Sequence, residues 1–184
     1  MNQIVSFLDK STSTLAAAIA LALIVAIVKL VSDNHLERSK RRVRRLQGQI
    51  EEFYGPLFSI VYQLATAAEI EERIRKENPL DDSQQQSREK FMLYNFYLPL
   101  HRQIRSILQS RLYLVNGLTV PESFENYLRH SVQYEVQSRL WFECQIKSDK
   151  TEGTPYPVDF NPDIEAGLDK VMEELGPALK SMKV

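Results

Sequence analysis

The sequence predicts an all-α protein, with one N-terminal transmembrane helix followed by a cytoplasmic antiparallel bundle of about four helices. One observation is an uninterrupted apolar block at residues 15–28 of the 184-residue chain. The other is that apolar residues after this block recur every three or four positions, which is the period of an amphipathic helix. No alternating strand pattern of useful length and no internal repeat is evident in the sequence.

The apolar block, LAAAIALALIVAIV, predicts a membrane-spanning helix over residues 12–31, preceded by a short tail at 1–11. Twenty residues rising about 1.5 Å each cover roughly the 30 Å of a bilayer's hydrocarbon core. Lys29 lies near one end, where its long side chain can reach the headgroups. The block contains neither Gly nor Pro, so the helix is expected to run without interruption.

Two other interpretations of the block were weighed against the membrane anchor. A buried core helix would normally carry a polar stripe, and this block has none. A cleaved signal peptide has a basic start, a shorter apolar run and a small-residue cleavage site, whereas MNQIVSFLDK is net neutral. We favour a retained anchor.

The segment 32–49 is strongly basic, and its charge predicts both topology and ligand. Basic residues next to a spanning helix remain on the cytoplasmic side, so the N-terminus is expected outside and the C-terminal domain in the cytoplasm of a bacterial inner membrane. Because the segment directly follows the spanning helix, we expect its basic side chains to contact anionic lipid headgroups. The six predicted headgroup contacts are Arg38, Lys40, Arg41, Arg42, Arg44 and Arg45.

Charge also argues against nucleic acid as a partner. Residues 1–45 contain 8 Lys/Arg and 3 Asp/Glu, whereas residues 46–184 contain 15 and 21, so a basic front is joined to an acidic body. An acidic folded domain repels phosphate. No nucleic-acid partner is therefore expected.

Residues 50–184 are expected to form the helical bundle. The first segment reaches about Lys76, interrupted at Gly55-Pro56, and a polar loop follows at 78–87. A second helix is predicted over 88–115 with a bend at Pro99. Their inward residues are Ile50, Phe53, Leu57, Ile60, Val61, Leu64, Ala67, Ala68, Tyr94, Tyr97, Leu98, His101, Ile104, Leu108, Leu112 and Val115.

Two more helices complete the predicted bundle. One has Thr119 near its N-cap and Pro121 in its first turn and runs to Lys147, and the last opens at Asn161-Pro162. Gly176-Pro177 is expected to bend the final turn. The inward residues are Phe124, Tyr127, Leu128, Ser131, Tyr134, Ser138, Trp141 and Phe142, then Ile164, Leu168, Val171, Met172, Leu175, Leu179 and Met182.

Three segments, EEFYGPL (51–57), VPESFENYLRH (120–130) and PYPVDFNPDIEAGLDK (155–170), carry a resemblance to known proteins. Over residues 46–180 the chain resembles uncharacterised bacterial membrane-anchored helical proteins with a juxtamembrane EEFYGPL-type segment. The resemblance implies a helical protein of the bacterial inner membrane. It implies no activity and no catalytic residues.

The chain carries no readable catalytic, cofactor or metal signature, so we expect no enzyme, no cofactor and no metal. His35, His101 and His130 lack metal-ligand spacing, and His101 is expected in the core, bonded to a carbonyl or a Tyr. Cys144 is expected to be a buried structural thiol. The adjacent acids at 51–52, 71–72 and 173–174 point to different helix faces and are expected to be solvated.

The expected function is that of a single-pass membrane protein displaying its bundle for protein–protein interaction. It would serve as a scaffold, regulator or subunit, for example in stress or phage defence. The protein partner is unknown, and a second copy of the chain is one candidate. The aromatic segments EEFYGPL and YNFYLPL (94–100) are expected in the core or in a groove for a partner helix. The alternatives are a membrane-tethered hydrolase of lipid or nucleotide, and a nucleic-acid tether.

Overall fold

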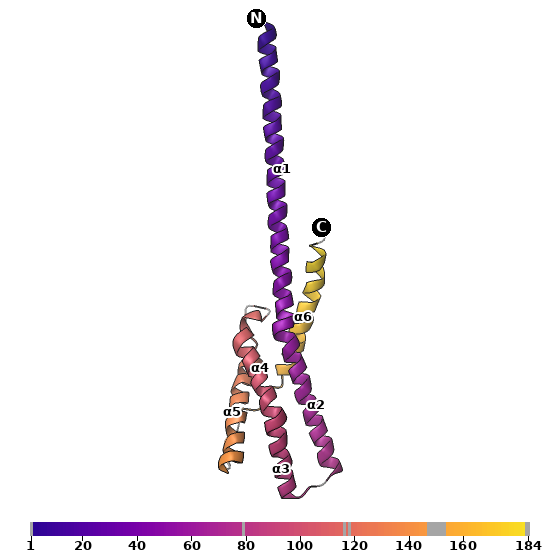
Figure 1. The fold of residues 1–184 in the computed structure, drawn as a ribbon, viewed down its shortest axis with the longest axis vertical. Helices are drawn as coiled ribbons and strands as arrows, with labels where there is room; N and C mark the ends of the chain where they lie inside the picture. Colours follow the sequence, from indigo (N-terminus) through magenta and orange to yellow (C-terminus); the bar gives the residue numbers. More distant parts are fainter. Residues whose placement is uncertain (1, 79, 116, 118, 147–153, 183–184) are drawn as a thin grey trace. The chain divides into compact units, whose positions relative to one another are not determined.

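The computed structural model describes the backbone of residues 2–78, 80–115, 117, 119–146 and 154–182, and their side chains from residue 21 onward. Within that part every regular element is a helix, which confirms the predicted all-α class. The α-helices (Figure 1) are α1 (Asn2–Gln49), α2 (Gly55–Glu77), α3 (Asp82–Met92), α4 (Leu98–Arg111), α5 (Glu122–Cys144) and α6 (Phe160–Lys180). The short elements are two π-helical turns, η1 (Ile50–Tyr54) and η2 (Leu93–Tyr97), and one 3₁₀ turn, η3 (Leu112–Leu114).

The chain divides into two compact units. The first comprises residues 1–44 and 177–184, and therefore most of α1 together with the last turn of α6. The second unit, Arg45–Gly176, contains the helical bundle.

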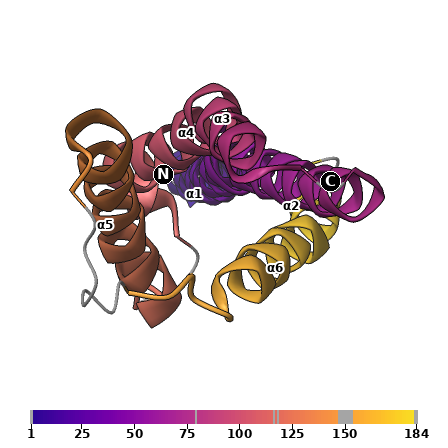
Figure 2. The ribbon, with the colours of Figure 1, turned by 90° about the horizontal axis from the view of Figure 1, so that it is seen from below.

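In the second unit α4 lies between α2 and α5, as Figure 2 shows from below. Short connections join these helices, which makes neighbours antiparallel. Side-chain pairs agree with that direction for α4 and α5. Tyr94, just before α4, bonds Glu143 at the end of α5, whereas His101 bonds Tyr127 nearer its start. The predicted antiparallel bundle is thus observed.

The core of the second unit is built from the predicted stripes of the first helices. On α4 the face that carries Leu98, His101, Ile104 and Leu108 is buried, because α4 packs against α2 on one side and α5 on the other. Aromatic rings fill the space between α5 and α6, with Tyr127 and Phe160 stacked 4.0 Å apart. The largest fully buried apolar side chains are Phe53, Leu57, Leu98, Ile104, Leu108, Phe124, Tyr127, Phe160, Ile164 and Val171.

Pro56 and Pro99 each follow a π-helical turn rather than a break. A proline inside a helix lacks an N–H and its ring clashes with the carbonyl four residues back. Here one extra residue in the preceding turn changes the register, so that Gly55 N–H bonds Ile50 O and Leu98 N–H bonds Leu93 O, both five residues back. The expected interruption at Gly55-Pro56 and bend at Pro99 are therefore π turns.

These two turns share the pattern Phe-Tyr-x-Pro-Leu, at 53–57 and again at 96–100. Each contributes buried residues to the α2–α4 packing, including Leu57 and Leu98. Only five positions recur, so the motif marks two similar turns and not a longer internal repeat.

Helix α6 approaches the bundle closely at Gly167. A Cβ atom at this position would overlap the aromatic ring of Tyr54, so only glycine allows the contact. This contact sets which face of α6 turns inward. Ile164, Val171 and Ala178 are buried, but Met172 and Leu179 are 58% and 41% exposed. The predicted α6 stripe was wrong at these last two positions.

Several predicted boundaries also differ from the structure. The predicted loop at 78–87 is shorter, because Asp81 caps α3 and accepts a bond from Gln84 N–H at 2.8 Å, while the Gln84 side chain accepts from Asp81 N–H. This capping box starts a helix inside a polar sequence. Pro121, rather than Thr119, is the N-cap residue of α5. The last helix begins at Phe160 and continues through Pro177 to Lys180.

The predicted membrane span at 12–31 finds no support in the structure. Among the residues whose side chains are described, no helix combines the length and the apolar character needed to cross a bilayer. Residues 12–20 of the predicted span lie outside those residues.

Candidate functional site

A cleft of about 320 Å³ opens in the second unit. Helix α2 contributes an aliphatic wall of Val61, Leu64, Ala65 and Ala68. The other walls carry Tyr97 from η2, His101 from α4 and Tyr134 from α5. Tyr156, in the segment before α6, and Asn161 on α6 complete them. Polar groups from several elements that converge on an otherwise apolar cleft are typical of a small-molecule site.

His101 is a buried histidine of the cleft wall. Its Nδ1 lies 2.7 Å from the Tyr127 hydroxyl. Burial above all, assisted by the charges of His130 and Arg105, lowers the pKa of His101 to about 4. The imidazole is thus neutral near pH 7, and a Tyr127 O–H that donates to Nδ1 leaves the His101 proton on Nε2. The expectation of a core histidine bonded to a tyrosine is confirmed.

His130 donates a hydrogen bond from Nδ1. Its Nδ1 lies 2.7 Å from the Thr154 carbonyl oxygen, which can only accept, so Nδ1 carries a proton. The ring is half-buried and lies 5.6 Å from His101, 5.9 Å from Tyr134 and 5.5 Å from Tyr156, measured between ring centres. His130 therefore joins the aromatic cluster of His101, Tyr134 and Tyr156.

Two tyrosine hydroxyls of the cleft are fixed by hydrogen bonds. Tyr97 donates to a Glu71 carboxylate oxygen at 2.5 Å, and Tyr156 donates to Asn161 Oδ1 at 2.6 Å. Burial raises the pKa of Tyr134 to about 12, and the nearby Glu71 charge adds to that rise. These tyrosines are uncharged at neutral pH, and Glu71 places a carboxylate beside two of them.

An ion-pair cluster lies around Glu135 on α5. Arg102 Nη2 donates to its Oε1 at 2.6 Å and Arg105 Nη2 to its Oε2 at 2.7 Å, with Arg139 Nε 3.5 Å from Oε1. The bond from Arg102, then that from Arg105, lowers the pKa of Glu135 to about 2. The cluster ties α4 to α5. We assign the cluster a structural role because its arginines and Glu135 pair with one another.

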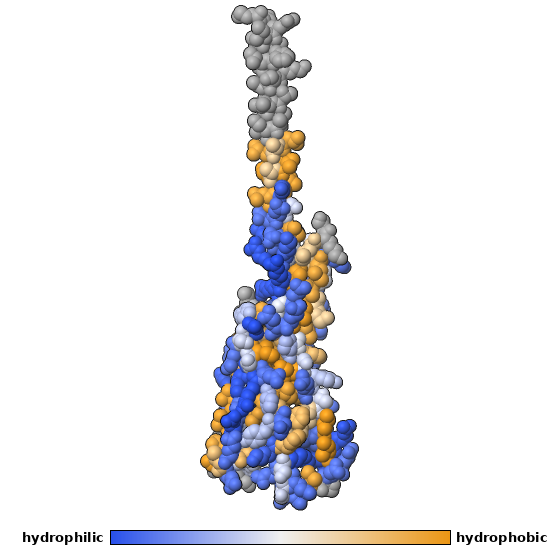
Figure 3. Space-filling view, in the orientation of Figure 1, coloured by the Kyte–Doolittle hydropathy of each residue, from blue (hydrophilic) through white to orange (hydrophobic). Residues whose placement is uncertain are grey.

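The six predicted headgroup contacts lie on α1. Arg38, Arg41, Arg42, Arg44 and Arg45 are exposed, while Lys40 is half-buried and pairs with Glu37 at 3.0 Å. In the first unit, the spacing i, i+3, i+4 places Arg38, Arg41 and Arg42 on one helix face. Figure 3 shows this hydrophilic band next to apolar side chains of the same helix.

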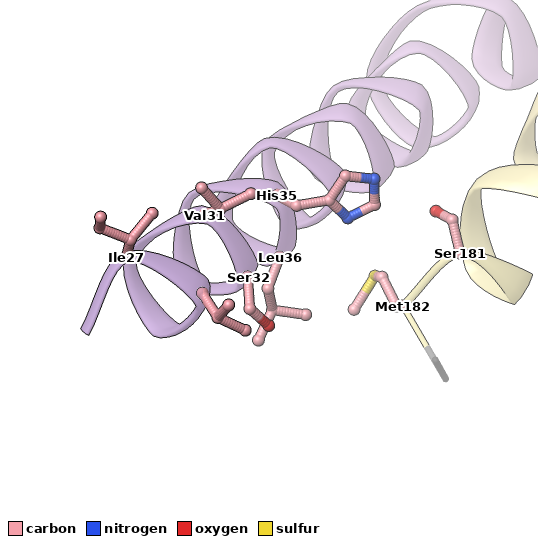
Figure 4. A pocket seen from close by; sticks show the side chains of 8 residues that line it. Ile27, Val31, Ser32, His35, Leu36, Ser181 and Met182 are labelled. Carbon is pink, nitrogen blue, oxygen red and sulfur yellow. The ribbon is translucent and has the colours of Figure 1, made fainter. Parts of the chain in front are cut away.

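A second hollow, of about 720 Å³, belongs to the first unit. Figure 4 shows Ile27, Val31 and Leu36 along α1, with the His35 imidazole directed towards Ser181 and Met182 near the end of α6. Its lining is mainly aliphatic with few polar groups. This suits an apolar chain better than a reacting substrate.

The other residues considered from sequence do not form a catalytic centre. Cys144 is exposed, because it is the last residue of α5 rather than part of the core, so the expectation of a buried thiol was wrong. In the part of the chain with described side chains, no group of three or more His, Cys, Asp or Glu could hold a metal ion. Of the paired acids, Glu71 has a specific role as the acceptor for Tyr97.

Sequence analysis missed the joint placement of Tyr97, Tyr134 and Tyr156. Tyr97 and Tyr134 were predicted as inward residues, but Tyr156 lies in the segment before α6, where periodicity gives no information. The available signal was the shared polar character of three inward positions on two helices, His101 on α4 and Ser131 and Tyr134 on α5.

Comparisons with known proteins identify no relative: no family model, curated protein or solved structure matches the chain. The resemblance of residues 46–180 to bacterial membrane-anchored helical proteins stays a prediction.

Proposed function

We propose that the chain is a single-pass protein of the bacterial inner membrane that presents its helical bundle to the cytoplasm for protein–protein interaction. Residues 12–31 would cross the bilayer, with the N-terminus outside. The six basic residues at 38–45 would contact anionic headgroups. No reaction is proposed, and the resemblance noted in the sequence agrees with this assignment.

The exposed apolar surface of α1 is the observation that carries this proposal. Eight large aliphatic side chains in the range 21–31 are between 58% and 64% exposed, and they spread over more than half of the helix circumference, with Ala22, Ala26 and Lys29 on the remaining side. Such a surface is unfavourable in water and marks contact with an apolar medium or partner. The eight are Leu21, Leu23, Ile24, Val25, Ile27, Val28, Leu30 and Val31.

The basic band beyond this surface supports a lipid as the contacting medium. A Lys or Arg near an anionic membrane gains about 1 kcal/mol, and the gain decays over a screening length of about 8 Å at physiological salt. Arg38, Arg41 and Arg42 share one face of α1, about 10–17 Å beyond Val31 at about 1.5 Å rise per residue. The headgroup layer covers roughly 5–8 Å of that distance, so these residues would lie within about one screening length of the membrane surface.

The interaction role is supported by a second exposed apolar face, on α2. Phe58, Tyr62, Ile70 and Ile74 follow one another at multiples of four residues and are 40%, 68%, 40% and 40% exposed. A groove of about 440 Å³ runs beside them towards Phe96, and none of the described residues that line it has a formal charge. An amphipathic helix of a partner protein fits such a groove.

Alkaline carbonate extraction tests the membrane assignment. The full-length protein is expected in the membrane pellet, and replacing both Leu23 and Ile27 with Arg should move it to the supernatant, because each charge at the bilayer centre costs about 2.5–3.5 kcal/mol. Replacing both Val132 and Val136 on α5, which are 47% and 51% exposed, gives a matched control that should stay in the pellet. Wild-type protein in the supernatant would contradict the proposal.

The same membranes test the interaction role. A photo-reactive residue at Phe96 should cross-link to one discrete protein partner, whereas the same residue at Tyr113, which is 70% exposed on η3, should not. Equal cross-linking from both positions would remove the groove from the proposal without affecting the membrane anchor.

A further inference from the structure

We infer that the cleft between α2 and the Tyr97, Tyr134 and Tyr156 side chains is a binding site for a small free organic cation of the quaternary ammonium class. This site lies wholly in the second unit and does not depend on the proposed membrane function. It is also separate from the groove beside Phe96. The argument rests on the chemistry of the cleft walls, their charge and their size.

The cleft walls carry aromatic rings of the kind that recognise a quaternary ammonium. Tyr97, His101, Tyr134 and Tyr156 all line the cleft. His101 and Tyr134 are 5.0 Å apart with planes inclined by 45°. Organic cations bind against ring faces within about 6 Å of the ring centre, and cages of such rings recognise choline-like groups.

Glu71 adds a negative charge just behind these rings. Its carboxylate accepts the Tyr97 hydrogen bond at 2.5 Å, and a phenol that donates to a carboxylate has a more electron-rich ring. Arg88 Nε lies 4.0 Å from the other Glu71 oxygen, at the outer limit for an ion pair, and is a buried nitrogen without a hydrogen-bond partner in the described structure. Glu71 thus meets the Tyr97 hydroxyl through one carboxylate oxygen and the Arg88 guanidinium through the other, without a hydrogen bond from Arg88 Nε.

The cleft lining holds no competing positive charge. His101 stays neutral near pH 7 because burial lowers its pKa to about 4. Arg105, which acts on His101 from outside the lining, is engaged by Glu135 at 2.7 Å. Glu71 lies behind the Tyr97 wall and the lining contains no Lys or Arg, so the walls favour a cation over an anion.

The aliphatic wall and the size of the cleft define the rest of the ligand. Val61, Leu64, Ala65 and Ala68 present only methyl and methylene groups, which suit the methyl groups of a quaternary ammonium and give no hydrogen bond to a primary one. A volume of about 320 Å³ is at the lower end for ligand pockets. A free molecule the size of choline is the best match.

Calorimetric titration of the full-length chain in maltoside solution tests the assignment, because maltoside carries no ammonium group. Choline is the first probe, and 3,3-dimethylbutan-1-ol, which has the same shape without the charge, is the second. Choline should bind, and the neutral isostere should bind at least about tenfold more weakly. No choline binding, or equal binding of both probes, would overturn the inference.

Variants locate the site. Tyr134→Leu should weaken choline binding by about tenfold, and Glu71→Gln, which keeps an acceptor for Tyr97, should weaken choline but leave the isostere unchanged. Tyr113→Leu, at the 70% exposed position on η3, is the control and should bind choline as the wild type does. A Glu71→Gln chain with a wild-type helical circular dichroism spectrum and unchanged choline affinity would refute the charge argument.

A third probe separates a free cation from a lipid headgroup, since both can carry the same ammonium group. Glycerophosphocholine adds the phosphate that a headgroup would bring, and Glu71 should repel it. It is therefore expected to bind more weakly than choline. Tighter binding of glycerophosphocholine would overturn the assignment to a free ligand.

Discussion

Burying His101 among aromatic rings makes its neutral form part of the folded state. The folded pKa is about 4, below the ordinary value of 6.5. Between these two pH values the unfolded chain binds a proton that the folded chain does not. Stability from His101 is therefore complete above about pH 6.5 and is lost as the pH falls towards 4.

His101→Asn tests this dependence. Urea unfolding of the full-length chain, followed by circular dichroism, should show that wild-type stability falls by about 2–3 kcal/mol between pH 6.5 and 4, and that the variant loses most of this slope. The asparagine amide can still accept from Tyr127. His35→Asn on the exposed part of α1 is the control, and a wild-type slope in His101→Asn would contradict the prediction.

Glu135 also makes the stability of the fold depend on pH, but over a lower pH range than His101. Arg102 and Arg105 lower its pKa to about 2 from the usual 4.5, so its contribution is present above about pH 4.5 and decreases below it. The slope that remains in His101→Asn should therefore begin near pH 4.5. The two groups are separable because their windows hardly overlap.

Residue positions were predictable from the sequence where helical period alone decides them. Leu98, His101, Ile104 and Leu108 are buried as expected, since α4 is packed on both sides. Cys144 was not, because period cannot show where a helix projects beyond its neighbours. The cleft was also beyond prediction, since it needs the lateral order of α2, α4 and α5.

At the scale of elements, one missing side chain fixes how α6 packs. Gly167 allows the Tyr54 ring to lie against the α6 backbone. Periodicity predicted a stripe through Met172, yet Met172 is exposed, whereas Ile164 and Val171, on either side of Gly167, are buried. A hydrophobic pattern shows how wide the apolar face of a helix is. It does not show which part of that face packs against the neighbouring helix, as Gly167 does against Tyr54.

Gly167→Ala should therefore destabilise the bundle, by about 1–3 kcal/mol, because the new methyl group overlaps a ring that is itself buried. Gly176→Ala in the same helix is the matched control. Nothing lies within 4 Å of a Cβ added at Gly176, and alanine is the better helix former, so that variant should be neutral or slightly more stable. Thermal unfolding of both variants measures the difference, and equal melting temperatures would contradict the prediction.

The π turns show a further limit of sequence analysis at this scale. A proline inside an apolar helical pattern predicts a break or a kink. The extra residues in η1 and η2 instead keep both helices continuous and preserve the inward direction of Leu57 and Leu98. The sequence shows where the proline lies, but it does not show the π turn that accommodates the proline.

At the scale of the whole molecule, charge is distributed unevenly along the chain. Net charge is −1, yet the basic residues are concentrated before residue 46 and the acidic excess follows it. In the proposed topology the basic segment faces the cytoplasm, as positive charge next to a spanning helix does. This arrangement predicts a direction that can be reversed by charge alone.

A reporter that is active only in the cytoplasm, fused after Val184, should be active on the wild-type chain. Changing Arg38, Lys40, Arg41, Arg42, Arg44 and Arg45 to Gln leaves only Lys29 as a basic residue beside the rear end of the apolar block, so reporter activity should fall as part of the population inverts. Changing six basic residues far from that block, at 73, 75, 76, 88, 90 and 180, is the control and should leave activity unchanged. A periplasmic reporter that is active on the wild-type C-terminus would show the opposite topology, because the bundle would then have crossed the membrane despite the basic segment beside it.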